Sequence, residues 1–228
     1  MNEKLDNVKD ETILWKYMSF SKFVNLLSGK MYMNRIDKFE DGMEGRLTNK
    51  LREFIEKNGD SSLLNIEKVV NNTFYISSFH ASEHETPFMW YQYSQQDGVA
   101  IQTTSRNLKN AFATTNEKIY LSNITYLDYN EDVFSLQNIF SLAIHKRKNF
   151  EAEKEVRCIL WKLPELENNK HSIFDIDTPE GIKIPIDLDQ LIQKIYISPY
   201  APLYIEENVK ILLEKFGLNK EVIKSELL

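Results

Sequence analysis

Aromatic and β-branched residues gather in short segments along the chain, bounded by Gly, Pro, Asn or Ser. Such segments are typical of β-strands, because branched and aromatic side chains pack well on a pleated surface. The strands that this pattern predicts lie at residues 12–18, 30–34, 73–79, 99–103 and 155–161, with a further strand within 118–126.

The longest helical pattern covers Glu131–Lys148, where apolar residues from Val133 to Ile144 recur at helical spacing. Asn130 stands where it can cap the start of this helix, and the basic run His145–Lys148 falls at its C-terminal end, which favours cations. Helices and strands are mixed without a repeating β-α-β order. The pattern therefore predicts an α+β fold with a mostly antiparallel, mixed sheet and packed helices.

We find no internal repeat and no linker that would divide the chain. The sequence predicts a single α+β domain over residues 12–228, preceded by a polar N-terminal tail over residues 1–11. A chain of 228 residues can bury a large apolar core without covalent cross-links. Its one cysteine, Cys158, excludes an internal disulfide framework.

The chain is acidic, with 28 Lys and Arg residues against 34 Asp and Glu residues and a net charge of −6. This balance makes nucleic acid an unlikely partner, because nucleic-acid binding is dominated by positive charge. No apolar run approaches the roughly 18 residues of a membrane span, and the N-terminus lacks the apolar core of a signal peptide. We therefore expect a cytoplasmic protein with no membrane partner.

A Glu-x-Glu-x-Arg pattern at Glu153, Glu155 and Arg157 is the first candidate for chemistry. Alternate residues of a strand share a face, so these three side chains are expected on one face and Val156 and Cys158 on the other. In a catalytic site, Glu155 would orient or activate a substrate hydroxyl, Arg157 would hold an anionic group, and Glu153 would assist. The alternative is an edge strand with a surface Glu–Arg pair, which contributes about 0–1 kcal/mol.

Aromatic and basic residues elsewhere could bind a nucleotide. Trp90 and Tyr93 could stack on a nucleobase or a nicotinamide ring, although such aromatic clusters also form cores. Lys16 and Tyr17 end the first predicted strand and Arg35 follows the second, so these residues could bind phosphate. The alternative for the basic residues is a solvated side chain whose stem covers apolar surface.

A metal site is not expected. His80, Glu83 and His84 match the H-x-x-E-H pattern of some zinc proteases, which requires both histidines on one helix face. Here they follow a predicted strand and precede Pro87, so a pair of loop histidines is the better interpretation. A zinc-dependent hydrolase, with Glu153 or Glu155 as a third ligand, stays open as an alternative.

Four segments in order resemble the bacterial domain of unknown function 2971 family. They are Leu14–Gly45, Tyr75–Ile101, Phe150–Leu160 and Lys183–Pro202. The residues that match the motifs of the family are Phe39, Asp41 and Glu44, then Met89, Trp90, Tyr93, Gly98 and Val99, and finally Glu153, Glu155 and Arg157. The resemblance implies a ligand-binding role for Asp41 and Glu44.

The order of these elements is also similar to the ADP-ribosyltransferase fold. This second resemblance implies NAD as cofactor, bound by Lys16 or Arg35 and by Tyr93 or Trp90. Glu155 would then stabilise the oxocarbenium ion that develops on the ribose. Families of this kind occur in toxin and phage-defence loci, which implies that context for this chain.

Two classes of function follow. The first is a nucleotide-binding enzyme or effector that resembles ADP-ribosyltransferases, with a small-molecule or nucleotide ligand. The second is a non-catalytic module that binds a ligand or a protein. In the second class the Glu–Arg row is structural and the aromatic cluster is buried.

Overall fold

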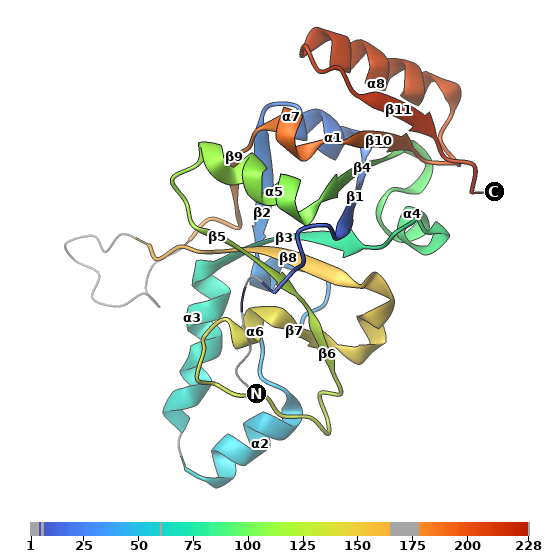
Figure 1. Ribbon diagram of the computed structural model, residues 1–228. Coiled ribbons are helices and arrows are strands. Elements are labelled where there is room, and N and C mark those ends of the chain that lie inside the picture. Colours follow the sequence, from blue (N-terminus) through green and yellow to red (C-terminus); the bar gives the residue numbers. More distant parts are fainter. Residues whose placement is uncertain (1–4, 6, 60, 165–177, 228) are drawn as a thin grey trace. The chain divides into compact units, whose positions relative to one another are not determined.

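The computed structural model describes residues 5, 7–59, 61–164 and 178–227 (Figure 1). The chain forms two compact units. Unit 1 consists mainly of Met33–Ser77 and Lys118–Ile182, and unit 2 of Val8–Tyr32, Ser78–Glu117 and Lys183–Leu228. Among the residues described, no helix combines the length and the hydrophobicity that a membrane span requires. The expectation of a single domain over residues 12–228 stays a prediction.

Unit 2 is organised around neighbouring strands of a sheet. Their order is β11 (Glu221–Lys224), β10 (Lys194–Ile197), β4 (Gly98–Thr104), β1 (Ile13–Ser19) and the end of β3 (Phe74–Ala81). All of these neighbours are antiparallel except β10 and β11, which are parallel. The helices of this unit are α1 (Phe20–Leu26), α4 (Pro87–Tyr93), α5 (Ser105–Ala111), α7 (Leu188–Leu191) and α8 (Leu203–Lys215), with the short 3₁₀ helices η3 (Gln95–Asp97) and η4 (Phe112–Thr114).

Unit 1 contains the strands that carry the Glu-x-Glu-x-Arg pattern. The end of β2 (Lys30–Arg35) pairs antiparallel with β3, and β8 (Glu155–Trp161) pairs with both β3 and β5 (Ile119–Asn123). A separate two-stranded sheet joins β6 (Thr125–Leu127) and β7 (His145–Arg147) in parallel. The other elements are η1 (Ile36–Lys38), α2 (Asn49–Lys57), η2 (Ser61–Asn65), α3 (Ile66–Thr73), α6 (Ser141–Ile144), η5 (Lys148–Glu153) and β9 (Gly181–Pro185), whose end belongs to unit 2.

The core of unit 1 lies between these strands and helices. Phe74 of β3 packs edge-to-face on Phe140, at 5.0 Å between ring centroids, and Ile159 of β8 is fully buried beside them. Residues of η1, of the segment after it and of α2 belong to the same core, among them Ile36, Leu47, Leu51 and Ile55. The apolar spacing of α2 explains its place, because Leu51 and Ile55 lie one turn apart on the same face.

The predicted α+β class and the mostly antiparallel sheet are confirmed, but the predicted helix over Glu131–Lys148 is wrong. Within that segment the structure has α6 at Ser141–Ile144 and β7 at His145–Arg147, and Lys148 begins η5. Short polar side chains explain the difference. Asp128 accepts a hydrogen bond from the Asn130 backbone N–H, and Asp132 accepts one from the Asp128 N–H. Such local bonds compete with those of a helix.

Gly45 provides a test of the backbone that connects η1 to α2. Its φ is +69°, and a Cβ atom there would lie 2.7 Å from Asn71 Oδ1. Gly217, at the end of α8, has φ +70° and open space around it. We expect Gly217→Ala to cost about 1–2 kcal/mol of unfolding free energy, from the left-handed backbone alone. Gly45→Ala should cost clearly more in urea unfolding, and equal losses would contradict the close contact with Asn71.

Candidate functional site

Strand β8 is an interior strand of its sheet, because it pairs with β3 on one side and β5 on the other. Both of its faces are buried, from Glu155 to Leu160. The alternative of an edge strand with a surface Glu–Arg pair is therefore wrong. The predicted row of three residues on one strand also needs correction. Glu153 ends η5, and Lys154, with φ +40°, turns the chain into β8.

Arg157 is the centre of the polar contacts around β8. Its side chain is fully buried, with none of its surface exposed. Its Nε donates to Glu155 Oε1 at 2.6 Å, and its Nη2 donates to Glu44 Oε2 at 2.7 Å and to Glu155 Oε2 at 3.1 Å. Its Nη1 donates to the Ala143 carbonyl at 2.8 Å. The guanidinium thus joins β8, α6 and the loop that carries Glu44.

Lys146 is the second cation of this interior. Its Nζ donates to Glu153 Oε2 at 2.6 Å and to Glu155 Oε2 at 3.2 Å, and lies 3.3 Å from Glu44 Oε1. The sequence pattern predicts Lys146 at the C-terminal end of a helix, where its charge would be solvated. On β7 its side chain points inward instead, and only 6% of it is exposed.

Glu44, Glu153, Glu155, Lys146 and Arg157 together form what we call the buried charge cluster. Burial lowers the pKa of Lys146 and of Arg157, but the neighbouring carboxylates Glu155 and Glu44 raise both pKa values further, so each ends above its ordinary range. Both cations are therefore charged at neutral pH. Three carboxylates against two cations leave one negative charge in excess.

The burial of Glu155 bears on its predicted catalytic role. Both of its carboxylate oxygens accept from Arg157, one also accepts from Lys146, and 4% of the side chain is exposed. Its backbone N–H donates to the Tyr126 hydroxyl at 2.7 Å. A carboxylate enclosed in this way holds its neighbours in position more readily than it reaches a substrate. Catalysis by Glu153, Glu155 and Arg157 stays a prediction.

Asp41 and Arg147 form a more exposed ion pair in the same unit. Arg147 Nη2 donates to Asp41 Oδ1 at 2.7 Å, and its Nε donates to Asp41 Oδ2 at 3.1 Å. The Asp41 side chain is 4% exposed, whereas the Arg147 side chain is 40% exposed. The two-point contact fixes the plane of the guanidinium.

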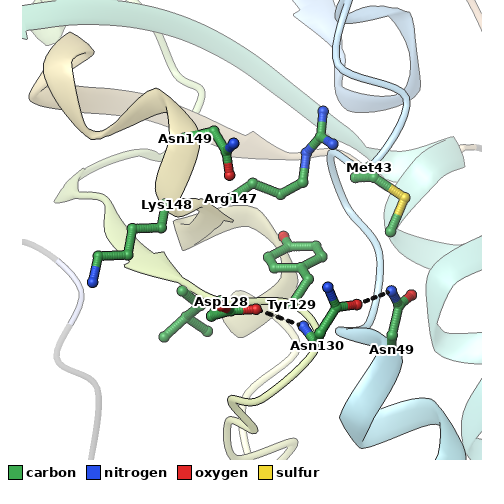
Figure 2. Close-up of a pocket in the computed structure, with 9 residues that line it drawn as sticks. Met43, Asn49, Asp128, Tyr129, Asn130, Arg147, Lys148 and Asn149 are labelled. Carbon is green, nitrogen blue, oxygen red and sulfur yellow. Dashed lines mark hydrogen bonds between the residues drawn. The ribbon is translucent and has the colours of Figure 1, made fainter.

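A pocket of about 530 Å³ lies beside Arg147 (Figure 2). Its lining consists of Met43, Asn49, Leu127, Asp128, Tyr129, Asn130, Arg147, Lys148 and Asn149. The loop on one side is held by local bonds, because the Asn130 N–H donates to Asp128 at 2.9 Å and the Asn49 amide donates to Asn130 Oδ1 at 2.8 Å. The volume falls within the range of about 300–1,000 Å³ that is usual for ligand pockets.

Tyr129 connects this pocket with the interior. Its side chain is mostly buried, and burial, followed by the charge of Glu44, raises its pKa above the ordinary range. The hydroxyl is therefore neutral and able to donate a hydrogen bond. No periodicity marks this residue in the sequence; only the turn-forming residues around it, Asp128 and Asn130, signal a loop.

Other predicted site residues lie in unit 2, where their polar atoms are engaged. Lys16 Nζ donates to the Ser78 carbonyl at 3.0 Å, Trp90 Nε1 donates to Glu85 at 2.9 Å, and the Tyr17 hydroxyl accepts the Thr86 N–H at 3.1 Å. Tyr17 and Trp90 meet edge-to-face at 4.9 Å within a buried aromatic cluster. Tyr93, on the same helix as Trp90, is 41% exposed.

Arg35, His80 and His84 belong neither to the pocket lining nor to the buried charge cluster. Arg35 is buried in unit 1, where it donates to both carboxylate oxygens of Asp37 and to the carbonyl and hydroxyl of Thr178. His80 is buried on β3, whereas His84 is exposed in the following loop. Across the described part of the chain, no three His, Cys, Asp or Glu side chains are grouped so as to hold a metal ion.

Comparisons with known proteins give similarity at the level of structure. No family model and no curated protein matches the sequence. DarT from Thermus sp. 2.9 in complex with NAD+ is similar at 10% identity and a TM-score of 0.45, over 96% of this chain and 98% of that chain. The same DarT in complex with ADP-ribosylated ssDNA is similar at 10% identity and a TM-score of 0.43, over 98% of each chain.

The buried charge cluster predicts a large difference between two neighbouring lysines. Lys146→Met leaves three buried carboxylates with a single cation, so we expect a loss of about 3–5 kcal/mol of unfolding free energy. Lys148→Met changes an exposed lysine two residues away and should cost less than about 0.5 kcal/mol. Urea unfolding at pH 7 measures both, and a small loss for Lys146→Met would show that the cluster does not support the fold.

Tyr126 predicts a change of stability with alkaline pH. Burial raises its pKa to about 12 in the folded protein, against about 10 unfolded. Its neutral form is therefore stabilised by folding, and this contribution is complete below pH 10 and declines as the pH rises toward 12. Tyr126→Phe leaves the Glu155 N–H without its acceptor, which should cost about 1–3 kcal/mol. The stability difference between wild type and variant should shrink above pH 10, and a constant difference from pH 9 to 11 would contradict the raised pKa.

Proposed function

We propose that unit 1 binds a small nucleotide-like ligand in the pocket beside Arg147. The observation that carries this proposal is the pocket itself, with its mixed lining and its fixed loop. Arg147 and Lys148 supply cations, three asparagines supply donors and acceptors, and Met43 and Leu127 supply apolar surface. A nucleotide combines the same kinds of group, because it has a phosphate, hydroxyls and a planar base.

The charges of the lining agree with such a ligand. Arg147 forms an ion pair with Asp41. The lining also contains one carboxylate, Asp128, and one further cation, Lys148, so it has no large excess of either charge. A strongly basic pocket would favour inorganic anions and polyanions instead. A balanced, hydrogen-bonding pocket suits a ligand of which only one part is charged.

In this proposal the buried charge cluster positions the pocket and does not touch the ligand. Lys146 and Arg147 are consecutive on β7. Lys146 belongs to the buried charge cluster, whereas Arg147 lines the pocket. Asp41 and Glu44 belong to one loop. Asp41 binds Arg147 of β7, and Glu44 binds Arg157 of β8. Glu153, Glu155 and Arg157 would then set the distance between the loop and β7.

The competing proposal is an enzyme that transfers ADP-ribose from NAD, with Glu155 beside the ribose. It requires Glu155 to leave its contacts with Lys146 and Arg157 when NAD binds. Release of nicotinamide from NAD+ by the purified protein, lost in Glu155→Gln with binding retained, would establish this alternative. The enclosure of Glu155 favours binding without that step.

A bulky residue in the pocket tests the proposal. Asn149 lines the pocket from η5, whereas Glu151 on the same 3₁₀ helix is exposed and outside the lining. We expect at least one of NAD+, ADP-ribose and AMP to bind in isothermal titration calorimetry. Asn149→Trp should weaken that binding at least tenfold because the indole fills the space, while Glu151→Trp should leave it unchanged.

Two results would overturn the proposal. If none of the three compounds binds at millimolar concentration, the pocket does not take a nucleotide. If Asn149→Trp and Glu151→Trp bind equally well, the compound occupies a different place. Melting temperatures of both variants should stay near that of wild type, since each substitution is on the surface.

A further inference from the structure

The contacts of Arg147 hold its guanidinium group as a fixed plane, so the group is not a free positive charge. Asp41 holds two of its nitrogens, Nε and Nη2, through a bidentate contact. The ring of Phe150 lies beneath the guanidinium, with 5.3 Å from its centroid to the Arg147 Cζ atom. An aromatic ring and a carboxylate thus determine where the plane of the guanidinium lies.

Arg147 also lines the pocket. It is 40% exposed although its carboxylate partner is almost fully buried. Figure 2 shows the Arg147 side chain extended among the other lining residues, between Asn149 and Met43 in this view and with Tyr129 below it. Part of this side chain is therefore open to the pocket.

The positive charge of Arg147 is already neutralised by an ion pair before any ligand binds. Asp41 neutralises it at 2.7 Å, and the buried charge cluster in the same unit carries an excess negative charge. An incoming phosphate would meet a guanidinium with a carboxylate beside it. A planar neutral group would meet no such opposition, and guanidinium planes stack on bases as aromatic rings do.

We infer that Arg147, held flat by Asp41 and Phe150, is the surface on which the base of the ligand stacks. This inference rests on the proposed nucleotide-binding function and names the part of the nucleotide that this pocket recognises. The asparagine amides of the lining would meet the edge of the base, since an amide presents a donor and an acceptor side by side. Affinity would come from the planar base, and the phosphate would add little.

Ligand fragments separate the base from the phosphate. We would titrate the protein with the four ribonucleosides, with the four nucleoside monophosphates and with ribose 5-phosphate. The inference expects at least one nucleoside to bind within about threefold of its monophosphate, and ribose 5-phosphate to bind at least tenfold more weakly. If ribose 5-phosphate binds as well as the monophosphates and the nucleosides do not bind, the pocket recognises phosphate and the inference is wrong.

Two variants of Arg147 separate planarity from charge. Arg147→Lys keeps the charge and loses the plane, whereas Arg147→Gln loses the charge and keeps a planar group. Stacking predicts that Arg147→Lys weakens nucleoside binding at least tenfold and that Arg147→Gln binds more tightly than Arg147→Lys. The opposite order would overturn the inference. Glu151→Gln, at an exposed residue of η5 outside the lining, should bind nucleosides as wild type does.

Failure of the inference can be distinguished from failure of the proposed function. If no nucleoside, monophosphate, NAD+ or ADP-ribose binds, the proposed function fails and takes the inference with it. If a nucleotide binds and Asn149→Trp blocks it, but Arg147→Lys binds nucleosides normally, the function stands and the stacking role of Arg147 is wrong. Thermal unfolding of each variant establishes that the folded protein is being compared.

Discussion

The contact of the buried Arg157 guanidinium with Glu155 and Glu44 is the constraint on which unit 1 depends. Taking these charges out of water costs several kcal/mol for each ion, and only complete pairing offsets that cost. Arg157 achieves it through Glu155, the Ala143 carbonyl and Glu44, which lie 2, 14 and 113 residues from it in the chain. The loop of Glu44, the end of α6 and β8 must therefore come together for any one of them to be stable.

The same constraint places the pocket. Along β7, Lys146 enters the charge cluster and Arg147, the next residue, faces the pocket, as expected from the alternation of side chains along a strand. Along the facing loop, Glu44 belongs to the cluster and Asp41 binds Arg147. Two segments thus supply both the interior cluster and the lining beside it. A shift of one residue along β7 would exchange the roles of Lys146 and Arg147.

The sequence predicted the strands better than the contacts between them. Strands β1, β4 and β8 begin and end within one residue of the expected positions, because their composition is local information. The Glu-x-Glu-x-Arg pattern and the family resemblance pointed to Glu153, Glu155, Arg157 and Glu44 as site residues, but neither predicted that the four share one buried cluster. Lys146 could not be predicted as a member because helical spacing continues up to Ile144, whereas the structure ends α6 there and begins β7 at His145. No local signal shows that a lysine will be buried. The burial of both faces of β8 is likewise set by distant partners.

The odd number of charges in the cluster has a consequence for how this protein can change over evolutionary time. With three carboxylates sharing two cations, the effect of replacing one member depends on which others are present. Loss of Lys146 should be better tolerated in a chain that has already lost Glu153, its nearest carboxylate at 2.6 Å. A first substitution of Glu153 by a neutral residue would then allow a later substitution of Lys146 that the present sequence does not tolerate. The cluster is therefore expected to vary as a set, with its members exchanged in pairs of opposite charge.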